Sequence, residues 1–198
     1  MPYERDHADL QCLIVNNTAF VLSCCKQLIH VLSCDYQVIP CGGRFSGKYP
    51  DNTCLSAVYC GDKLIGRVAS LDEQVKAYCH DHKIELINVN QGYAKCSCVS
   101  IADNAIITAD NGIIHALQDT QIDVLPIGKG SVQLKGAEYG FLGGASGYDR
   151  NTRTVYFCGA IEHHPDSKQI HDFCKKHGTT MISLTDHQLT DIGGILFC

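Results

Sequence analysis

The chain has 198 residues, of which 45% are hydrophobic and 19% are charged, and this composition is typical of one globular domain spanning residues 1–198. A net charge of −5 excludes the strongly basic surface that a nucleic acid or an anionic membrane would attract. The longest mostly apolar stretch, residues 19–32, is too short and too polar to span a bilayer, and no signal peptide precedes it. We therefore expect a cytoplasmic protein whose partners include neither nucleic acid nor membrane.

Thirteen cysteines are many for a chain of this length. In the absence of a signal peptide we expect reduced thiols, because the cytosol keeps cysteines reduced. Most of them, such as Cys12 and Cys158, lie in apolar strings, where cysteine acts as a small core residue. No Cys-x-x-Cys pair and no Gly-x-Gly-x-x-Gly run occurs in the sequence, so we expect neither a metal site nor a cofactor.

In chain order, the first predicted elements are a strand at residues 10–15, a helix at residues 19–32 and a strand at residues 36–40. The polar run Asn16-Asn17-Thr18 predicts the start of the helix, because short polar side chains accept hydrogen bonds from the first free amides.

Three longer units follow, and each combines a β-hairpin, a helix and a return strand. The second unit has hairpin strands at residues 53–60 and 63–68, a helix at 70–83 and a strand at 84–89. The third has hairpin strands at residues 90–101 and 105–108, a helix at 110–118 and a strand at 123–127. The fourth, after a polar loop at residues 128–140, has hairpin strands at 141–146 and 154–158, a helix at 165–177 and a strand at 180–184.

The units repeat at a regular spacing. Asp62 and Asp103 occupy the same hairpin corner 41 residues apart, a period typical of repeat architectures. The strand at residues 10–15 lacks a hairpin partner, and residues 195–198 form a strand with no helix after it. We expect these two terminal strands to pair, which would close a ring and remove exposed sheet edges. The predicted fold class is α/β, and the predicted architecture is an α/β propeller of four units rather than a doubly wound sheet.

Several motifs resemble those of a known group of proteins. They are Gln91-Gly92-Tyr93 with Lys95-Cys96-Ser97, residues 105–110, residues 139–147, His164-Pro165-Asp166 and Asp191-Ile192-Gly193. Over residues 49–195 the chain resembles a bacterial family of unknown function assigned to the guanidino-group-modifying-enzyme fold, also called the pentein fold. Family members resemble five-unit propellers, whereas four units are counted here. The missing piece is a unit between the first strand–helix–strand and Tyr49, together with any site residues that it would carry.

The resemblance implies a chemistry. Pentein hydrolases and amidinotransferases use a cysteine nucleophile near the C-terminus, a histidine that moves the proton, and carboxylates that hold the planar guanidinium cation. The ending Gly193-Gly194-Ile195-Leu196-Phe197-Cys198 is similar to the approach to that nucleophile. A small buried residue at the end of a strand is the alternative role for Cys198.

The candidate site residues follow from these motifs. The catalytic candidates are Cys198, Cys96 and His164, and the substrate-binding candidates are Gln91, Tyr93, Asp110, Gly143, Gly144, Ser146 and Asp191. The neighbouring ammonium group of Lys95 would favour a Cys96 thiolate, but strand alternation places the two side chains on opposite faces. Asp110 is also well placed to cap its helix.

Two functions remain open at this point. The first is a cysteine-dependent hydrolase or transferase that acts on a small guanidino or amidine compound. The second is a non-catalytic binding or assembly protein on a degenerate pentein scaffold. The sequence leaves a homodimer open as the assembly.

Overall fold

The computed structural model describes residues 7–42 and 48–197, and it consists of four units with the same order of elements. Each unit is a three-stranded sheet in which a β-hairpin is followed by a helix and a third strand. Unit one contains β1 (Cys12–Val15), β2 (Thr18–Leu22), α2 (Lys26–Leu32) and β3 (Gln37–Cys41). Unit two contains β4 (Ala57–Cys60), β5 (Lys63–Gly66), α3 (Glu73–Asp81) and β6 (Glu85–Asn88). Unit three contains β7 (Cys98–Ala102), β8 (Ala105–Thr108), α5 (Asn111–Ala116) and β9 (Asp123–Pro126). Unit four contains β10 (Ser146–Asp149), β11 (Thr154–Phe157), α6 (Ser167–Lys176) and β12 (Thr180–Ser183).

The pairing within the sheets is the same in all four units. The first two strands pair antiparallel, and the third strand pairs parallel to the second. A parallel neighbour requires a crossover connection, and the helix of each unit supplies it. The repetition of four hairpin–helix–strand units that the sequence predicts is therefore present.

Among the residues that the structure describes, four short helices lie outside this repeat. They are α1 (Ala8–Gln11), α4 (Ala94–Ser97) and the 3₁₀ turns η2 (Asp51–Thr53) and η3 (Ile161–His163). Both α-helical turns immediately precede a first strand, α1 before β1 and α4 before β7, and the two turns contact one another. They bring residues 8–11 and 94–97 together in the middle of the molecule.

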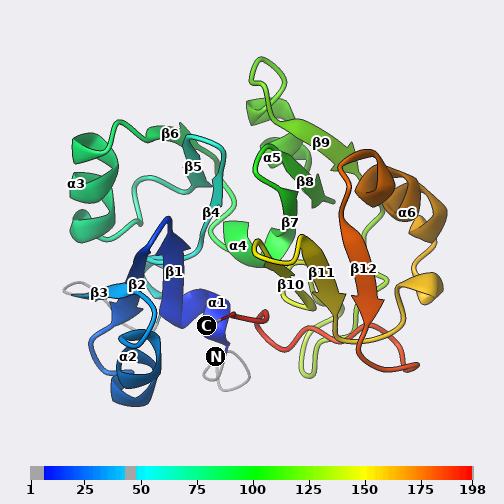
Figure 1. The fold of residues 1–198 in the computed structure, drawn as a ribbon, viewed down its shortest axis with the longest axis horizontal. Coiled ribbons are helices and arrows are strands. Elements are labelled where there is room, and N and C mark those ends of the chain that lie inside the picture. Colours follow the sequence, from blue (N-terminus) through cyan, green and yellow to red (C-terminus); the bar gives the residue numbers. More distant parts are fainter. Residues whose placement is uncertain (1–6, 43–47, 198) are drawn as a thin grey trace.

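The first strands of the units face the middle of the molecule, and helices α2, α3 and α6 lie on the outside (Figure 1). Strand β1 contacts β4, β4 contacts β7, and β7 contacts β10. Three of the four hydrophobic clusters contain residues of neighbouring units: Phe20 and Leu64 belong to one, Ile65 and Ile106 to another, and Ile107 and Phe157 to a third. The hydrophobic core therefore consists of separate clusters, most of which lie where neighbouring units meet.

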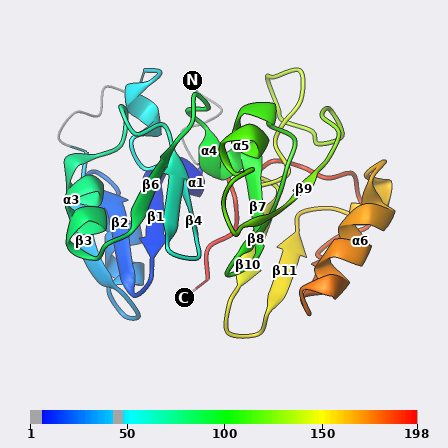
Figure 2. The ribbon, with the colours of Figure 1, turned by 90° about the horizontal axis from the view of Figure 1, so that it is seen from above.

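The C-terminal segment lies between unit four and unit one, as the view from above shows (Figure 2). The amide of Ile195 donates to the Ser146 carbonyl of β10, and the amide of Asp9 donates to the Gly193 carbonyl. Leu196 packs against the apolar cluster of unit one. The two ends of the chain thus lie side by side, but residues 195–197 are not a strand, so the predicted pairing with residues 10–15 is wrong.

Unit one is complete, which corrects the prediction of a helix at residues 19–32. Strand β2 covers the first part of that stretch, and α2 begins only at Lys26. Asn16, with a φ of 53°, turns the chain between β1 and β2, a conformation that asparagine tolerates better than most residues. All five residues of β2 are buried, so this middle strand has the uniform apolar character of a sheet covered on both faces. The hairpin partner of the first strand is therefore its own neighbour in sequence.

Two other boundaries differ from the prediction and affect the site. Residues 94–97 form the helical turn α4 instead of part of a strand, and β7 begins at Cys98. Residues 141–145 are turns, and β10 begins at Ser146. In both cases the strand begins several residues later than predicted, and the residues before it form a helical turn or other turns.

The described cysteines are all free thiols, and eight of the twelve are buried. Burial raises the pKa of Cys12, Cys98 and Cys174 to about 12, so these thiols are protonated at neutral pH. The expected role of most cysteines as small core residues is confirmed for this part of the chain. Among the helices of residues 7–42 and 48–197, none is long and apolar enough to cross a membrane.

Candidate functional site

A cavity of about 520 Å³ lies in the middle of the molecule, between the first strands of the four units. We call it the axial cavity. Its wall includes Leu13 of unit one, Val58 of unit two, Val99 of unit three and Tyr148 of unit four, and the C-terminal segment 193–197. Asp9 and Lys95 line it as well, and they come from the two helical turns α1 and α4. Residues from all four units can therefore contact one ligand.

Asp9 is an unusual carboxylate, because it is buried without an N–H or O–H donor. Its residue is only 2% exposed, and within the described parts of the chain the Cys96 thiol is the side chain that acts on it as a hydrogen-bond donor. Burial raises the pKa of Asp9, and the neighbouring Asp191 adds to this, whereas Cys96 and Lys95 oppose it. Such an arrangement is costly for a folded protein, since an unsatisfied buried charge loses its hydration without compensation.

Cys96 lies on α4 beside Asp9, and its thiol is buried. Burial is the main cause that raises the pKa of Cys96 well above its usual value, and Asp9 and Asp191 raise it further. Lys95 acts in the opposite direction on both Cys96 and Asp9. Lys95 is the smallest of the causes that act on Cys96, so the net effect of this environment favours the protonated thiol and not the thiolate.

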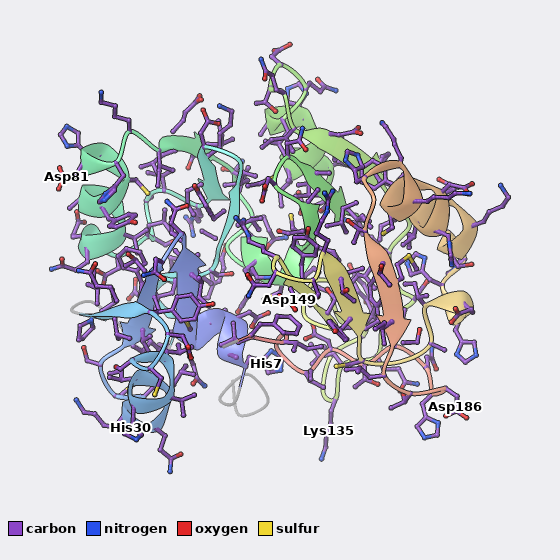
Figure 3. The ribbon with its side chains drawn as sticks, viewed as in Figure 1. His7, His30, Asp81, Lys135, Asp149 and Asp186 are labelled. Carbon is purple, nitrogen blue, oxygen red and sulfur yellow. The ribbon has the colours of Figure 1, made fainter. Side chains whose placement is uncertain are left out.

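His7 and Asp191 complete the cluster around Asp9. The Nδ1 atom of His7 lies 4.0 Å from an Asp9 oxygen and 3.9 Å from an Asp191 oxygen. Figure 3 shows His7 in the middle of the molecule, whereas labelled polar residues such as Lys135 and Asp186 lie at its periphery. Both oxygens of Asp191 accept backbone hydrogen bonds, at 2.9 Å from the Phe141 amide and at 3.0 Å from the Gly193 amide. Asp191 therefore holds two loops in place, whereas the Asp9 oxygens accept no backbone hydrogen bond in the described chain.

Glycines make this packing possible. A Cβ atom on Gly144 would lie 2.1 Å from an Asp191 oxygen, and one on Gly143 would lie 2.3 Å from the Cys98 carbonyl oxygen. Gly193 has a φ of 83°, and a Cβ atom there would lie 2.3 Å from the Cα atom of His7. These positions exclude any side chain, so the loops before β10 and after Asp191 can close tightly around the cluster.

The structure divides the predicted site residues between two places. Cys96, Gly143, Gly144 and Asp191 lie in the Asp9 cluster, and Ser146 lines the axial cavity. Gln91, Asp110 and His164 line a second, smaller cavity, which we call the side pocket. Tyr93 stacks on Tyr49 with ring centroids 5.8 Å apart, and it lines neither cavity. Cys198 lies outside the described residues.

The side pocket has a volume of about 120 Å³ and lies between units three and four. Gln91 donates to one Asp110 oxygen at 2.9 Å, and the other Asp110 oxygen accepts from the amides of Gly112 and Ile113. The prediction that Asp110 caps α5 is therefore confirmed. His164 is buried, and its Nδ1 atom accepts the amide hydrogen of Asp166 at 3.1 Å.

Asp9 and His7 are missing from the candidates that the sequence suggests. The recognisable motifs begin at residue 49, and a single acidic residue before an apolar run carries no distinctive spacing. Only the closure of residues 7–11 against Gly193 brings these two side chains to the cavity. In residues 7–42 and 48–197, no group of three or more His, Cys, Asp or Glu side chains has a geometry suited to a metal ion.

Two comparisons with known proteins bear on identity. A search of curated proteins finds no match. A model for a family of unknown function, DUF6873, matches residues 2–196. The match extends across unit one and so includes residues 7–11, which lie outside the motifs recognised from sequence. The chain belongs to this family of unknown function, DUF6873.

Proposed function

We propose that this protein has a pentein-type α/β-propeller fold and binds a small guanidinium or amidinium compound in the axial cavity, with Asp9 as its anionic partner. The observation that carries the proposal is the Asp9 carboxylate, which is 2% exposed and has no N–H or O–H donor in the described chain, beside a cavity of about 520 Å³. A planar cation with several N–H donors would supply both the missing hydrogen bonds and the missing charge.

The repeated architecture supports the pentein assignment. Four hairpin–helix–strand units have their first strands toward a shared cavity, and the C-terminal segment lies between the last unit and the first. Pentein proteins resemble this plan with five units. Because unit one is complete, this chain differs from a five-unit pentein protein by one whole unit and not by an incomplete one. The four units that are present still surround a cavity.

Electrostatics favour a cation over a neutral ligand. Two carboxylates, Asp9 and Asp191, lie near each other in the buried cluster, and the charges of Lys95 and His7 act on Asp9 in the opposite direction to Asp191. The Gly194 backbone borders Asp9, and a Cβ atom there would lie 3.9 Å from an Asp9 oxygen. Since Gly194 and Asp9 both line the axial cavity, the proposal requires residues 193–194 to move so that a ligand in the cavity can contact the Asp9 oxygens.

A cysteine-dependent hydrolase or transferase is the second candidate function. The observation that favours it is the convergence of Cys96, His7 and two carboxylates in one cluster. The raised pKa of Cys96 opposes it, because the thiolate is the nucleophile. A cation bound at Asp9 would offset the carboxylate charge that raises this pKa, so substrate binding itself would favour the thiolate.

The binding proposal is tested by isothermal titration with methylguanidinium and with its neutral analogue of similar shape, methylurea. We expect methylguanidinium to bind and methylurea to bind at least tenfold more weakly, since a charge-assisted pair contributes about 1.5–3 kcal/mol. Asp9→Asn should abolish the preference. The matched control is Asp35→Asn, which removes the same charge from an exposed residue that lines the same cavity. Equal binding of the two compounds, or an unchanged preference in Asp9→Asn, would rule the proposal out.

Covalent labelling separates the two candidate functions. A chloroacetamidine reagent should modify a single cysteine, Cys96 or Cys198, in the enzyme, and methylguanidinium should protect that cysteine. A non-catalytic binding protein should instead react slowly, and first at the exposed Cys24 and Cys34. Peptide mapping of the adducts by mass spectrometry gives the answer directly.

A further inference from the structure

The side pocket between units three and four has the features of a ligand site separate from the Asp9 cluster. It holds about 120 Å³, which is room for about four water molecules at about 30 Å³ each. A ligand of that size has about four or five non-hydrogen atoms. None of the residues that line the side pocket also lines the axial cavity.

Ser97 gives the first sign of a missing partner. The residue is 6% exposed, it lines the side pocket, and its hydroxyl oxygen has no hydrogen-bond partner in the described chain. Its backbone carbonyl is already engaged, since it accepts the Thr108 hydroxyl at 2.8 Å. Buried hydroxyl groups are nearly always paired, so an unpaired one at the wall of a cavity indicates a ligand or ordered water.

His164 supplies a second polar group. Burial lowers the pKa of His164, so the imidazole is neutral at physiological pH despite the opposing effect of Asp166. Because Nδ1 accepts the Asp166 amide hydrogen, the single ring proton lies on Nε2. His164 is therefore a hydrogen-bond donor, and this tautomer cannot act as a general base through Nε2. The pocket is equipped for binding and not for activating the Ser97 hydroxyl.

Asp110 contributes an acceptor to the same pocket. One of its oxygens is used by the helix cap, and the other accepts a single hydrogen bond from Gln91, which leaves a lone pair free. The walls also include the aromatic rings of Tyr139 and Phe141, which lie edge to face with centroids 6.5 Å apart. The side pocket therefore combines the Ser97 and His164 donors, the Asp110 carboxylate and an apolar aromatic wall, and the exposed Lys129 lies at its edge.

We propose that the side pocket binds a small neutral molecule carrying a carboxamide or ureido group. Its carbonyl oxygen accepts from the Ser97 hydroxyl and from His164 Nε2, and its NH₂ group donates to Asp110. A carboxylate of the same shape matches the donors but is repelled by Asp110, and an amine matches Asp110 but leaves both donors unpaired. Among these three groups, the amide is the one that can satisfy all three side chains.

The test uses propanamide as the probe and propanoate as its charged isostere. We expect crystals soaked in propanamide to show its oxygen about 3 Å from Ser97 Oγ and His164 Nε2. We also expect titration to show propanoate binding at least tenfold more weakly. Ser97→Ala should weaken propanamide binding about tenfold, the effect of one lost hydrogen bond of about 1.4 kcal/mol. Ser100→Ala, which changes the same group on a residue lining the axial cavity, should leave it unchanged.

Three results would overturn the inference. The first is density for water alone in the side pocket at saturating propanamide. The second is propanoate binding as tightly as propanamide, and the third is equal affinity in Ser97→Ala and the unsubstituted protein. None of these measurements depends on Asp9. A negative result for the side pocket therefore leaves the proposal of cation binding in the axial cavity untouched, and the reverse also holds.

Discussion

Replacing Asp9 by asparagine is expected to stabilise the protein at neutral pH, although it changes a fully buried side chain. The folded-state pKa of Asp9 is raised by burial, and the unfolded value is near 3.9. Because the folded pKa is the higher of the two, Asp9 destabilises the fold increasingly as pH rises from its unfolded value through its folded value. Below the unfolded pKa the carboxyl group is protonated in both states, and the penalty vanishes.

The size of the effect follows from the absence of hydrogen-bond donors. An unsatisfied buried polar group costs about 1–3 kcal/mol, and a charged one costs more. Asparagine keeps the polar atoms but removes the charge, so we expect a gain of about 1–3 kcal/mol in the free energy of unfolding at the alkaline end. Each kilocalorie raises the melting temperature by about 2–4 °C for a domain of this size.

The assay is chemical denaturation of both proteins between pH 4 and pH 9, with Asp35→Asn as the control for charge. We expect the stability difference between Asp9→Asn and the unsubstituted protein to grow with pH, and that of the control to stay flat. A variant that is less stable by the same amount at every pH would refute the reasoning, because it would show that Asp9 makes stabilising contacts in the fold.

Three further substitutions test other parts of the structure, each by the free energy of unfolding. Gly144→Ala places a Cβ atom 2.1 Å from an Asp191 oxygen and should cost about 3 kcal/mol or more, whereas a loss below about 1 kcal/mol would show that the loops do not close as described. Asp110→Ala removes the cap of α5 and should cost about 1–2 kcal/mol, and no loss would contradict the cap. Tyr36→Phe removes the hydrogen bond from its hydroxyl to the Phe197 carbonyl and should cost about 1 kcal/mol, and an unchanged stability would argue against that attachment of the C-terminus.

The repeat could be predicted from sequence because turn and helix signals recur at corresponding positions in units two, three and four. The hairpin of unit one was not predicted, because the polar pair Asn16-Asn17 can either begin a helix or form the turn of a hairpin. The structure resolves the ambiguity through Asn16, whose φ of 53° belongs to a turn. Because all residues of β2 are buried, its sequence is a continuous apolar run without alternation. Such a run cannot be distinguished from part of a buried helix by sequence alone.

The site was predictable only in part, for a different reason. Cys96, Gly144 and Asp191 belong to recognisable motifs, and the structure brings them into one cluster. Asp9 carries no motif, and its significance arises from what surrounds it after folding: the α4 turn, the Gly193 carbonyl and the absence of a donor. The local sequence pattern cannot show that a group lacks donors, because this depends on residues far away in the sequence, at 94–97 and at 193.

The central claim is that a cation bound in the axial cavity pairs with Asp9, and proton release on binding tests it most directly. Titration with methylguanidinium in buffers of different ionisation enthalpy counts the protons released, because a cation that favours the ionised carboxylate displaces its proton at pH values between the bound and the free pKa. We predict release of up to one proton per ligand, with a maximum at an intermediate pH and none in Asp9→Asn. Binding without proton exchange across pH 4–9, or the same release in Asp9→Asn, would contradict the account.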